Sequence, residues 1–147
     1  MMGGMKDVPM LTQLNIVVSD MARTLAFYRR LGWSIATPTP DHAVAHLANG
    51  LSVEFDTREF VRVWDSEYQG GSGGTTVIGI GVRSRAAVDA LYADLVAAGH
   101  HGRQPPYDAF WGSRYAIVED PDGNPVGLMS PSDESARSAP PSKPPTS

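Results

Sequence analysis

The sequence presents the same order of secondary-structure signals twice, and this internal repeat constrains the fold more than any other feature. Gln13 in the first half corresponds to Val77 in the second, and Asn49 to Asp122, so the repeat period lies between 64 and 73 residues. A repeat of this kind indicates two copies of one supersecondary unit, each of which buries its apolar face in the same way. Both halves read as one strand, one helix and three further strands (β-α-β-β-β).

The first half begins with LTQLNIVVS, residues 11–19, whose alternation predicts a strand. Ser19 or Asp20 can cap a helix that runs to Leu31, and Gly32 is the kind of residue that ends a helix. This helix carries an apolar stripe made of Met21, Leu25, Tyr28 and Leu31. Three further strands are predicted, the last two joined by a tight Ala-Asn-Gly turn: 33–37 (WSIAT), 42–47 (HAVAHL) and 51–56 (LSVEFD).

The second half follows the same order. TVIGIGV, residues 76–82, predicts a strand, and Ser84 can cap a helix that Gly99 ends. The apolar face of that helix consists of Val88, Leu91, Leu95 and Ala98. After a loop rich in proline and aromatic residues, two more strands are predicted at 113–119 and 124–130.

The turn between those last two strands contains Asp120, Asp122 and Asn124 around a glycine, which raises the question of a calcium loop. An EF-hand loop that began at Asp120 would need a glycine at its sixth position and a glutamate at its twelfth. This chain has Pro125 and Pro131 there. Pro-Asp-Gly-Asn is typical of tight turns, so these carboxylates are predicted to cap backbone amides.

Composition limits the class of protein. With 147 residues, of which 41% are hydrophobic, the chain fits one globular domain with a real core. The net charge of −4 and the lack of a basic run argue against nucleic-acid and membrane surfaces as partners. There are no cysteines, which excludes disulfides and thiolate chemistry. No apolar stretch approaches the ~20 residues that span a bilayer, and no signal-peptide core is seen, so a cytoplasmic location is expected.

We expect a single domain over residues 10–130. The C-terminal segment is rich in Pro and Ser and has little to bury, which predicts disorder. The expected parts are an N-terminal arm at 1–9, a first module at about 10–58, a connector at about 59–74 that includes QGGSGG, a second module at about 75–130 and a disordered tail at 131–147.

Three stretches, in this order and spacing, make the chain resemble the vicinal oxygen chelate superfamily: LNIVVSDMARTLAFYRRLGW, NGLSVEFD and WGSRYAIVEDPDGNPVGL. That superfamily includes glyoxalase I, bleomycin-resistance proteins and extradiol dioxygenases. The resemblance covers roughly residues 10–130. It implies an α+β fold in which two βαβββ modules form a cupped mixed sheet, with helices on the convex side and a ligand cleft on the concave side. It also implies a homodimer.

Alternation along the strands assigns side chains to the cleft face of this fold. In the first half that face carries Gln13, Asn15, Glu54 and Asp56, with His42 and His46 from the neighbouring hairpin strand. In the second half it carries Val77, Gly79, Gly127 and Met129, with Tyr115 from the hairpin partner.

Metal-dependent members of the family hold one divalent ion with four side chains, and the resemblance carries these positions to Gln13, Glu54, Val77 and Gly127. Valine and glycine side chains cannot coordinate a metal, and a catalytic site normally needs at least three protein ligands. No metal and no other cofactor are therefore expected, and Gln13 and Glu54 are the only candidate ligands if an ion binds.

His42 and His46 do not restore such a site. In a strand they are separated by ~13 Å, too far to share one ion. His42 is interpreted as a polar residue at a strand edge, and His46 as a polar residue that lines the pocket.

Aromatic and acidic residues around the cleft predict a flat, partly cationic ligand, bound through stacking and cation–π contacts. Glu54 has three open interpretations: a partner of Gln13 across the sheet, an anchor for the ligand, or a general base. The aromatic residues have the alternative of packing the core or a dimer interface. The predicted ligand-binding residues are Gln13, His46, Glu54, Asp56, Trp64, Tyr68, Phe110, Trp111, Tyr115 and Met129.

Three functions compete. The leading hypothesis is a homodimeric, metal-independent protein of the bleomycin-resistance type, which binds an aromatic or antibiotic-like small molecule. The alternative is a metal-dependent glyoxalase-like lyase or isomerase, or a dioxygenase, with a reduced or displaced metal site. The third is an interaction module with a vestigial cleft. No nucleic acid and no membrane are expected as partners.

Overall fold

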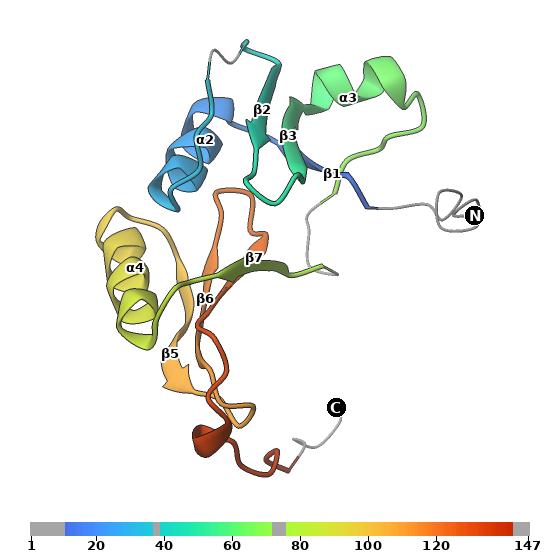
Figure 1. Cartoon of the computed structure of the whole chain (residues 1–147). Coiled ribbons are helices and arrows are strands. Elements are labelled where there is room, and N and C mark those ends of the chain that lie inside the picture. The colour runs from blue at the N-terminus through green and yellow to red at the C-terminus, as the bar shows by residue number, and fades with distance from the viewer. Residues whose placement is uncertain (1–10, 37–38, 72–75, 143–147) are drawn as a thin grey trace, which may run out of the picture. The chain divides into compact units, whose positions relative to one another are not determined.

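The computed structural model describes residues 11–36, 39–71 and 76–142. The chain divides into two compact units, Met1–Gly70 and Gly71–Ser147, and each is described by itself. Each unit combines helices with a small mixed sheet, so the expected α+β class is confirmed. Figure 1 shows the elements of both units along the chain.

The first unit contains the elements β1 (Gln13–Val18), α2 (Met21–Arg30), β2 (His42–His46), β3 (Ser52–Thr57) and α3 (Arg58–Trp64). Its sheet has the order β1-β3-β2, with β1 parallel and β2 antiparallel to the central strand. A β-α-β connection to a parallel neighbour and a hairpin account for this topology.

Helix α2 begins as the sequence predicts, because the Asp20 side chain accepts a hydrogen bond from the Arg23 backbone N–H. Its buried side, which includes Phe27 and Tyr28, packs into the core of the first unit. The Tyr28 ring stacks on Trp33 with 4.9 Å between ring centroids, and its centroid lies 5.1 Å from that of Phe55. Trp33 is therefore part of this core.

Two predictions in the first half are wrong. Residues 33–36 form no strand but a single bridge, between Ile35 and Ala45, and residue 37 lies outside the described residues. The predicted connector begins with helix α3, which Thr57 caps by accepting a hydrogen bond from Phe60 N. The buried Val61 anchors this helix.

The second unit contains β4 (Ile78–Gly81), α4 (Arg85–Ala97), β5 (Gly102–Asp108), β6 (Arg114–Glu119), β7 (Pro125–Met129) and a 3-10 turn, η1 (Glu134–Ala136). Its sheet has the order β4-β7-β6-β5, with only the β4–β7 pair parallel. Helix α4 packs against β5, β6 and β7 (Figure 1). The core of this unit is formed by Val88, Leu95, Ala116, Val118, Val126 and Leu128, all fully buried.

The segment predicted as a proline-rich loop is instead β5. It lies at the edge of the sheet and pairs with β6 through two register irregularities, on either side of Gln104. An edge strand tolerates Pro105 and Pro106 because it has ladder bonds on one side only.

The turn between β6 and β7 is confirmed. Oδ1 of Asp120 accepts hydrogen bonds from the backbone N–H groups of Asp122 and Asn124, each at 2.9 Å. The Asn124 side chain donates to Oδ2 of the same carboxylate at 2.8 Å. Asp120 is thus a turn residue that satisfies backbone donors.

The beginning of the predicted tail differs from the expectation of disorder. Residues 131–142 are described, and they include η1 and several hydrogen bonds to the loop before β6. Residues 1–9 and 143–147 lie outside the described residues. No helix in the described part of the chain has both the length and the apolar character that crossing a membrane requires.

Candidate functional site

Five polar side chains join across the sheet of the first unit: Gln13, Asn15, Asp56, His42 and Glu54. We call them the polar chain. Asn15 lies opposite Glu54 in the β1–β3 register, and His42 lies opposite Asp56 in the β2–β3 register. The intervening residues Val53 and Phe55 are buried, so alternation places the polar chain on the other face of the sheet.

Asp56 is the centre of the polar chain, with a side chain that is only 1% exposed. Its Oδ2 accepts a hydrogen bond from Asn15 Nδ2 at 2.8 Å, and its Oδ1 lies 2.5 Å from His42 Nδ1. An ionised carboxylate can only accept hydrogen bonds, so Nδ1 of His42 is the donor in this pair. Both carboxylate oxygens are thereby satisfied, as burial of a charged group requires.

The remaining ring nitrogen of His42, Nε2, lies 3.6 Å from Glu54 Oε1. The side chains of these two residues are 32% and 23% exposed, so this end of the polar chain is open to small molecules. The Phe60 ring of α3 is tilted against the imidazole, with 5.4 Å between the two ring centroids. An oriented imidazole beside a carboxylate can bind a polar group or exchange a proton with one.

The other predicted residues of the first unit lie apart from this centre or at its edge. Gln13 donates from Nε2 to Asn15 Oδ1 at 2.8 Å and so joins the polar chain at its far end. His46 is exposed, and its Nδ1 lies 3.3 Å from Ser52 Oγ. Trp64 is an exposed residue at the end of α3, and Tyr68 follows in the loop after it.

In the second unit, four rings from β5, β6 and the loop between them form an aromatic cluster: Tyr107, Phe110, Trp111 and Tyr115. Tyr115 is its central ring. It makes edge-on contacts with Trp111 and Tyr107, with 5.3 and 6.2 Å between the ring centroids. Phe110 meets Trp111 nearly perpendicularly at 5.2 Å. Tyr107 and Phe110 are exposed, as is Met129, which lies opposite Tyr115 in the β6–β7 register. Phe110, Trp111, Tyr115 and Met129 are among the predicted ligand-binding residues, and their role in binding stays a prediction.

Gly127 allows Tyr115 to take its position. A Cβ at residue 127 would lie 2.5 Å from the Tyr115 Oη and 3.1 Å from two of its ring carbons, so the ring occupies the space of a side chain. Burial, and secondarily Tyr107, raises the pKa of the Tyr115 phenol, which therefore stays neutral. The Trp111 Nε1 is buried and has no hydrogen-bond partner among the described residues.

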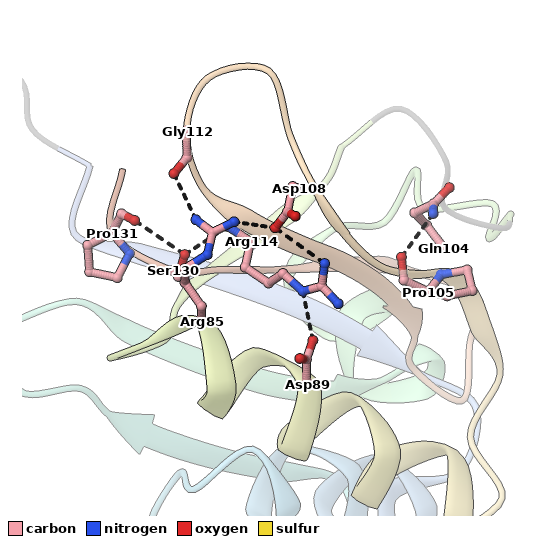
Figure 2. A network of polar contacts seen from close by, with 9 residues as sticks. All are labelled: Arg85, Asp89, Gln104, Pro105, Asp108, Gly112, Arg114, Ser130 and Pro131. Carbon is pink, nitrogen blue, oxygen red and sulfur yellow. Dashed lines mark hydrogen bonds and ion pairs between the residues drawn. The ribbon is translucent and has the colours of Figure 1, made fainter. Parts of the chain in front are cut away.

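A network of ion pairs fixes the ends of the loop that carries Phe110 and Trp111 (Figure 2). Arg85 pairs with Asp108, and its Nη1 also donates to the Gly112 carbonyl at 3.0 Å. Arg114 bridges two carboxylates: its Nε donates to Asp89 Oδ1 at 2.9 Å, and its Nη1 donates to Asp108 Oδ1 at 3.3 Å. The hydrogen bond from Arg85, together with the charges of both arginines, holds the pKa of the Asp108 carboxyl below its usual value.

The residues at the family's four metal positions do not fit a divalent ion. Only Gln13 and Glu54 carry coordinating atoms, Val77 is an exposed aliphatic residue, and the space beside Gly127 is filled by Tyr115. In the parts of the chain that the structure describes, no three His, Cys, Asp or Glu residues are grouped as metal ligands would be. The donor set falls below the three ligands that a catalytic site normally uses.

Two residues of the polar chain, Asn15 and His42, were not among the predicted site residues. Alternation places both on the correct face, but His42 reads as an edge residue when its strand is considered alone. Its contact with Asp56 follows from the hairpin register, which the tight turn at Asn49 and Gly50 fixes. The turn was therefore the sequence signal from which the pairing of His42 with Asp56 could have been predicted.

Comparison with known proteins gives a consistent result. A family model described as the Glyoxalase/Bleomycin resistance protein/Dioxygenase superfamily matches residues 10–128. Comparison with curated proteins finds no match.

Several solved structures are similar to this chain. A glyoxalase-related enzyme from Fulvimarina pelagi has 20% identity and a TM-score of 0.77, with 84% of this chain and 89% of that chain covered. A glyoxalase/bleomycin resistance protein/dioxygenase family enzyme from Burkholderia phytofirmans has 21% identity and a TM-score of 0.73, covering 83% and 98%. A lactoylglutathione lyase from Agrobacterium tumefaciens has 15% identity and a TM-score of 0.64, covering 84% and 95%. Identities this low establish the fold alone.

Proposed function

The chain belongs to the Glyoxalase/Bleomycin resistance protein/Dioxygenase superfamily, and on that premise we propose that it is a metal-independent small-molecule-binding protein. The ligand is a flat aromatic compound of the antibiotic-like kind, with at least one polar or cationic group. The observation that carries this proposal is the Tyr115 ring beside Gly127. It puts an aromatic surface at a position where a metal-dependent relative would carry a ligand side chain.

The aromatic cluster supports the stacking part of the proposal. Aromatic pairs contribute ~0.5–1.5 kcal/mol beyond the area that they bury, and partly exposed rings leave that contribution available to a ligand. Tyr107, Phe110 and Met129 are exposed around the more buried Tyr115. An exposed apolar group of this kind favours contact with a flat apolar molecule.

The polar chain of the first unit is a separate surface, and its chemistry is considered by itself. Glu54 is partly exposed and lies next to an imidazole that Asp56 orients. With two carboxylates and one histidine, the polar chain stays net negative whether His42 is neutral or protonated. It therefore suits a ligand that carries an amine or another cationic group.

Isothermal titration of the full-length protein in EDTA tests this function. The probes are flat aromatic amines such as 9-aminoacridine, with neutral aromatic compounds of similar size beside them. Trp111→Leu is expected to weaken binding about tenfold, the equivalent of ~1.4 kcal/mol. Tyr92→Leu, which removes an aromatic residue of α4 outside the cluster, is the matched control. Binding that requires added metal, or equal losses in both variants, would refute the proposal.

Proton-transfer catalysis of the lyase or isomerase kind is a second candidate, and one contact favours it. The buried Asp56 holds His42 through Nδ1, which leaves Nε2, 3.6 Å from Glu54 Oε1, as the nitrogen that a substrate could contact. A carboxylate that orients a histidine in this way is a recurring feature of acid–base catalysis.

Exchange of solvent deuterium into bound compounds, followed by NMR, distinguishes this second function from simple binding. His42→Gln is expected to reduce the exchange rate at least about 100-fold, the usual contribution of one acid–base group. His46→Gln is the control, because His46 lies on the same strand but contacts Ser52 and not Asp56. This variant should leave the exchange rate unchanged. If the wild-type protein catalyses no exchange, binding remains the function.

A homodimer and a cytoplasmic location complete the proposal. The support for the dimer is the apolar surface of α3 in the first unit, where Val63 is 78% and Trp64 55% exposed. Such residues on a short helix are typical of interfaces between chains.

A further inference from the structure

The segment that follows β7 crosses the loop that carries Phe110 and Trp111, and three hydrogen bonds join the two. Ser132 Oγ donates to the Trp111 carbonyl at 2.6 Å, and the Asp133 N–H donates to the Gly112 carbonyl at 3.0 Å. The Ser138 N–H donates to the Phe110 carbonyl at 2.8 Å. We call residues 132–138 the C-terminal strap and residues 110–112 the aromatic turn.

The strap has a defined local structure. Asp133 caps η1 by accepting hydrogen bonds from the Ser135 N–H at 3.0 Å and from its hydroxyl at 2.7 Å. These bonds hold the pKa of the Asp133 carboxyl below its usual value. Arg137 Nη1 donates to Glu134 Oε1 at 3.1 Å across the same turn. The strap therefore presents its donors to the aromatic turn in a fixed arrangement.

Gly112 is the point of closest approach. Its φ of +98° favours glycine, and a Cβ there would collide with the Asp133 carbonyl and lie 2.9 Å from Ser132 Oγ. Its own carbonyl accepts a hydrogen bond from the Asp133 N–H. It also accepts one from Arg85 Nη1, which Figure 2 shows. The aromatic turn is thus held between the strap and helix α4.

The aromatic turn contains a donor that calls for such restraint. Trp111 Nε1 is buried without a partner among the described residues, and leaving a buried donor unpaired costs ~1–3 kcal/mol. A turn that was free to move would relax until this N–H reached water or another acceptor. The three strap bonds and Arg85 oppose that relaxation.

We propose that the C-terminal strap is a positioning element, which holds the aromatic turn, and with it the exposed Phe110 ring, in the position from which it stacks on an aromatic ligand. This inference rests on the proposed function and adds to it the part of the chain that fixes the stacking surface. The strap lies beyond residue 128, where the match to the family model ends, so it is a feature of this chain outside the matched region.

A pair of truncations tests the strap. A chain that stops after Pro131 lacks the strap, whereas a chain that stops after Ser138 keeps all three bonds and serves as the control. The first readout is hydrogen exchange at the Gly112 amide, which bonds to the Ala109 carbonyl inside the turn. The shorter chain should exchange at least tenfold faster than the control. It should also bind the best probe of the aromatic panel about tenfold more weakly.

Gly112→Ala tests the same point without removing residues, in case the shorter chain fails to fold. It should displace the strap and reproduce both effects. Gly123→Ala is its control, because Gly123 also has a positive φ, of +82°, but nothing lies within 4 Å of its added Cβ.

The outcomes separate this inference from the proposed function. If the backbone amide of residue 112 exchanges at the wild-type rate in the truncated chain, and at the rate expected for an equally protected alanine in Gly112→Ala, the strap does not hold the aromatic turn. Faster exchange with unchanged affinity overturns its role in binding. A wild-type protein that binds none of the compounds overturns the proposed function, while the exchange comparison still decides whether the strap holds the turn.

Discussion

At the scale of single residues, the chemistry of the first unit depends on Asp56. A carboxylate this deeply buried is stable only when its oxygens are bonded, and Asn15 and His42 supply those bonds from the strands on either side. The same contacts decide the orientation of the His42 ring. One residue therefore links the stability of the sheet to the geometry of the candidate site.

Asp56→Asn is expected to lower the free energy of unfolding by about 1–2 kcal/mol, because the amide that replaces one carboxylate oxygen cannot accept from both neighbours. Chemical denaturation measures the change. Glu54→Gln is the matched control on the same strand, and since Glu54 is partly exposed it should cost less than about 0.5 kcal/mol. Equal losses in both variants would contradict the central position of Asp56.

Gly127→Ala is expected to destabilise the second unit by about 1–3 kcal/mol, because the new methyl group displaces the Tyr115 ring. Gly79, opposite Gly127 in the β4–β7 register, has nothing within 4 Å of an added Cβ, so Gly79→Ala should be neutral. Thermal unfolding compares the two.

Adding Tyr115→Phe to Gly127→Ala provides a second check, because it removes the Oη that would lie 2.5 Å from the new Cβ. The double variant should recover part of the lost stability. No recovery would mean that the cost has another origin.

At the scale of elements, the ion pairs of Arg85, Asp108 and Arg114 hold β5 and β6 to the start of α4. The lowered pKa of Asp108 in the folded chain has a defined consequence for pH. A group with a depressed folded pKa contributes stability above its unfolded pKa, which is about 3.9, and this contribution disappears as the pH falls through the folded value.

Asp108→Asn should therefore lower the melting temperature at neutral pH. The difference from wild type should begin to shrink as the pH falls past about 3.9 and should vanish below the folded pKa of Asp108. High salt should reduce the difference at neutral pH, because these side chains are exposed to solvent. Melting curves of both proteins, recorded from neutral pH to below about pH 3.9, measure this difference in melting temperature. A difference that stays constant with pH would contradict the assignment.

The elements that the sequence predicts are those whose signals are local. Asp20 and Ser84 cap α2 and α4 as expected, because an N-cap acts on the first turn of its own helix. Strand β5 was missed because the position of Pro105 at a sheet edge depends on the neighbouring strand. Helix α3 was missed because seven residues give too short a pattern to distinguish it from a connector.

The candidate site was predicted in part for the same reason. Alternation along one strand finds Gln13, Glu54 and Asp56, and the residues that pair with them need the register between strands. Composition also predicted disorder from Pro131 onward, whereas Ser132 and Asp133 bond to residues 21 positions earlier, and Ser138 to a residue 28 positions earlier. Contacts of that kind cannot be read from local composition.

At the scale of the whole molecule, the two units repeat one plan with different side chains on their sheets. The first presents the polar chain, and the second presents the aromatic cluster. A fold of this superfamily accommodates both because its strands fix the backbone while the residues on one face vary. Function must therefore be argued from these two sets of side chains.

Val63→Glu is expected to convert the proposed homodimer into a monomer, because a charge cannot be buried unpaired in an apolar interface. Light scattering coupled to size exclusion measures the mass. Val96→Glu, at an exposed position on α4, is the control and should leave the dimer intact. A wild-type protein that elutes as a monomer would contradict the dimer itself.

The central claim is that this chain binds its ligand without a metal. The most direct measurement is the affinity for the best aromatic probe, determined by titration calorimetry on protein purified without a histidine tag, first in EDTA and then with Zn²⁺, Mn²⁺ or Fe²⁺. We expect dissociation constants that agree within about twofold, since Gln13 and Glu54 alone do not make a metal site. Binding that appears only with a divalent ion, or tightens about tenfold with one, would contradict it.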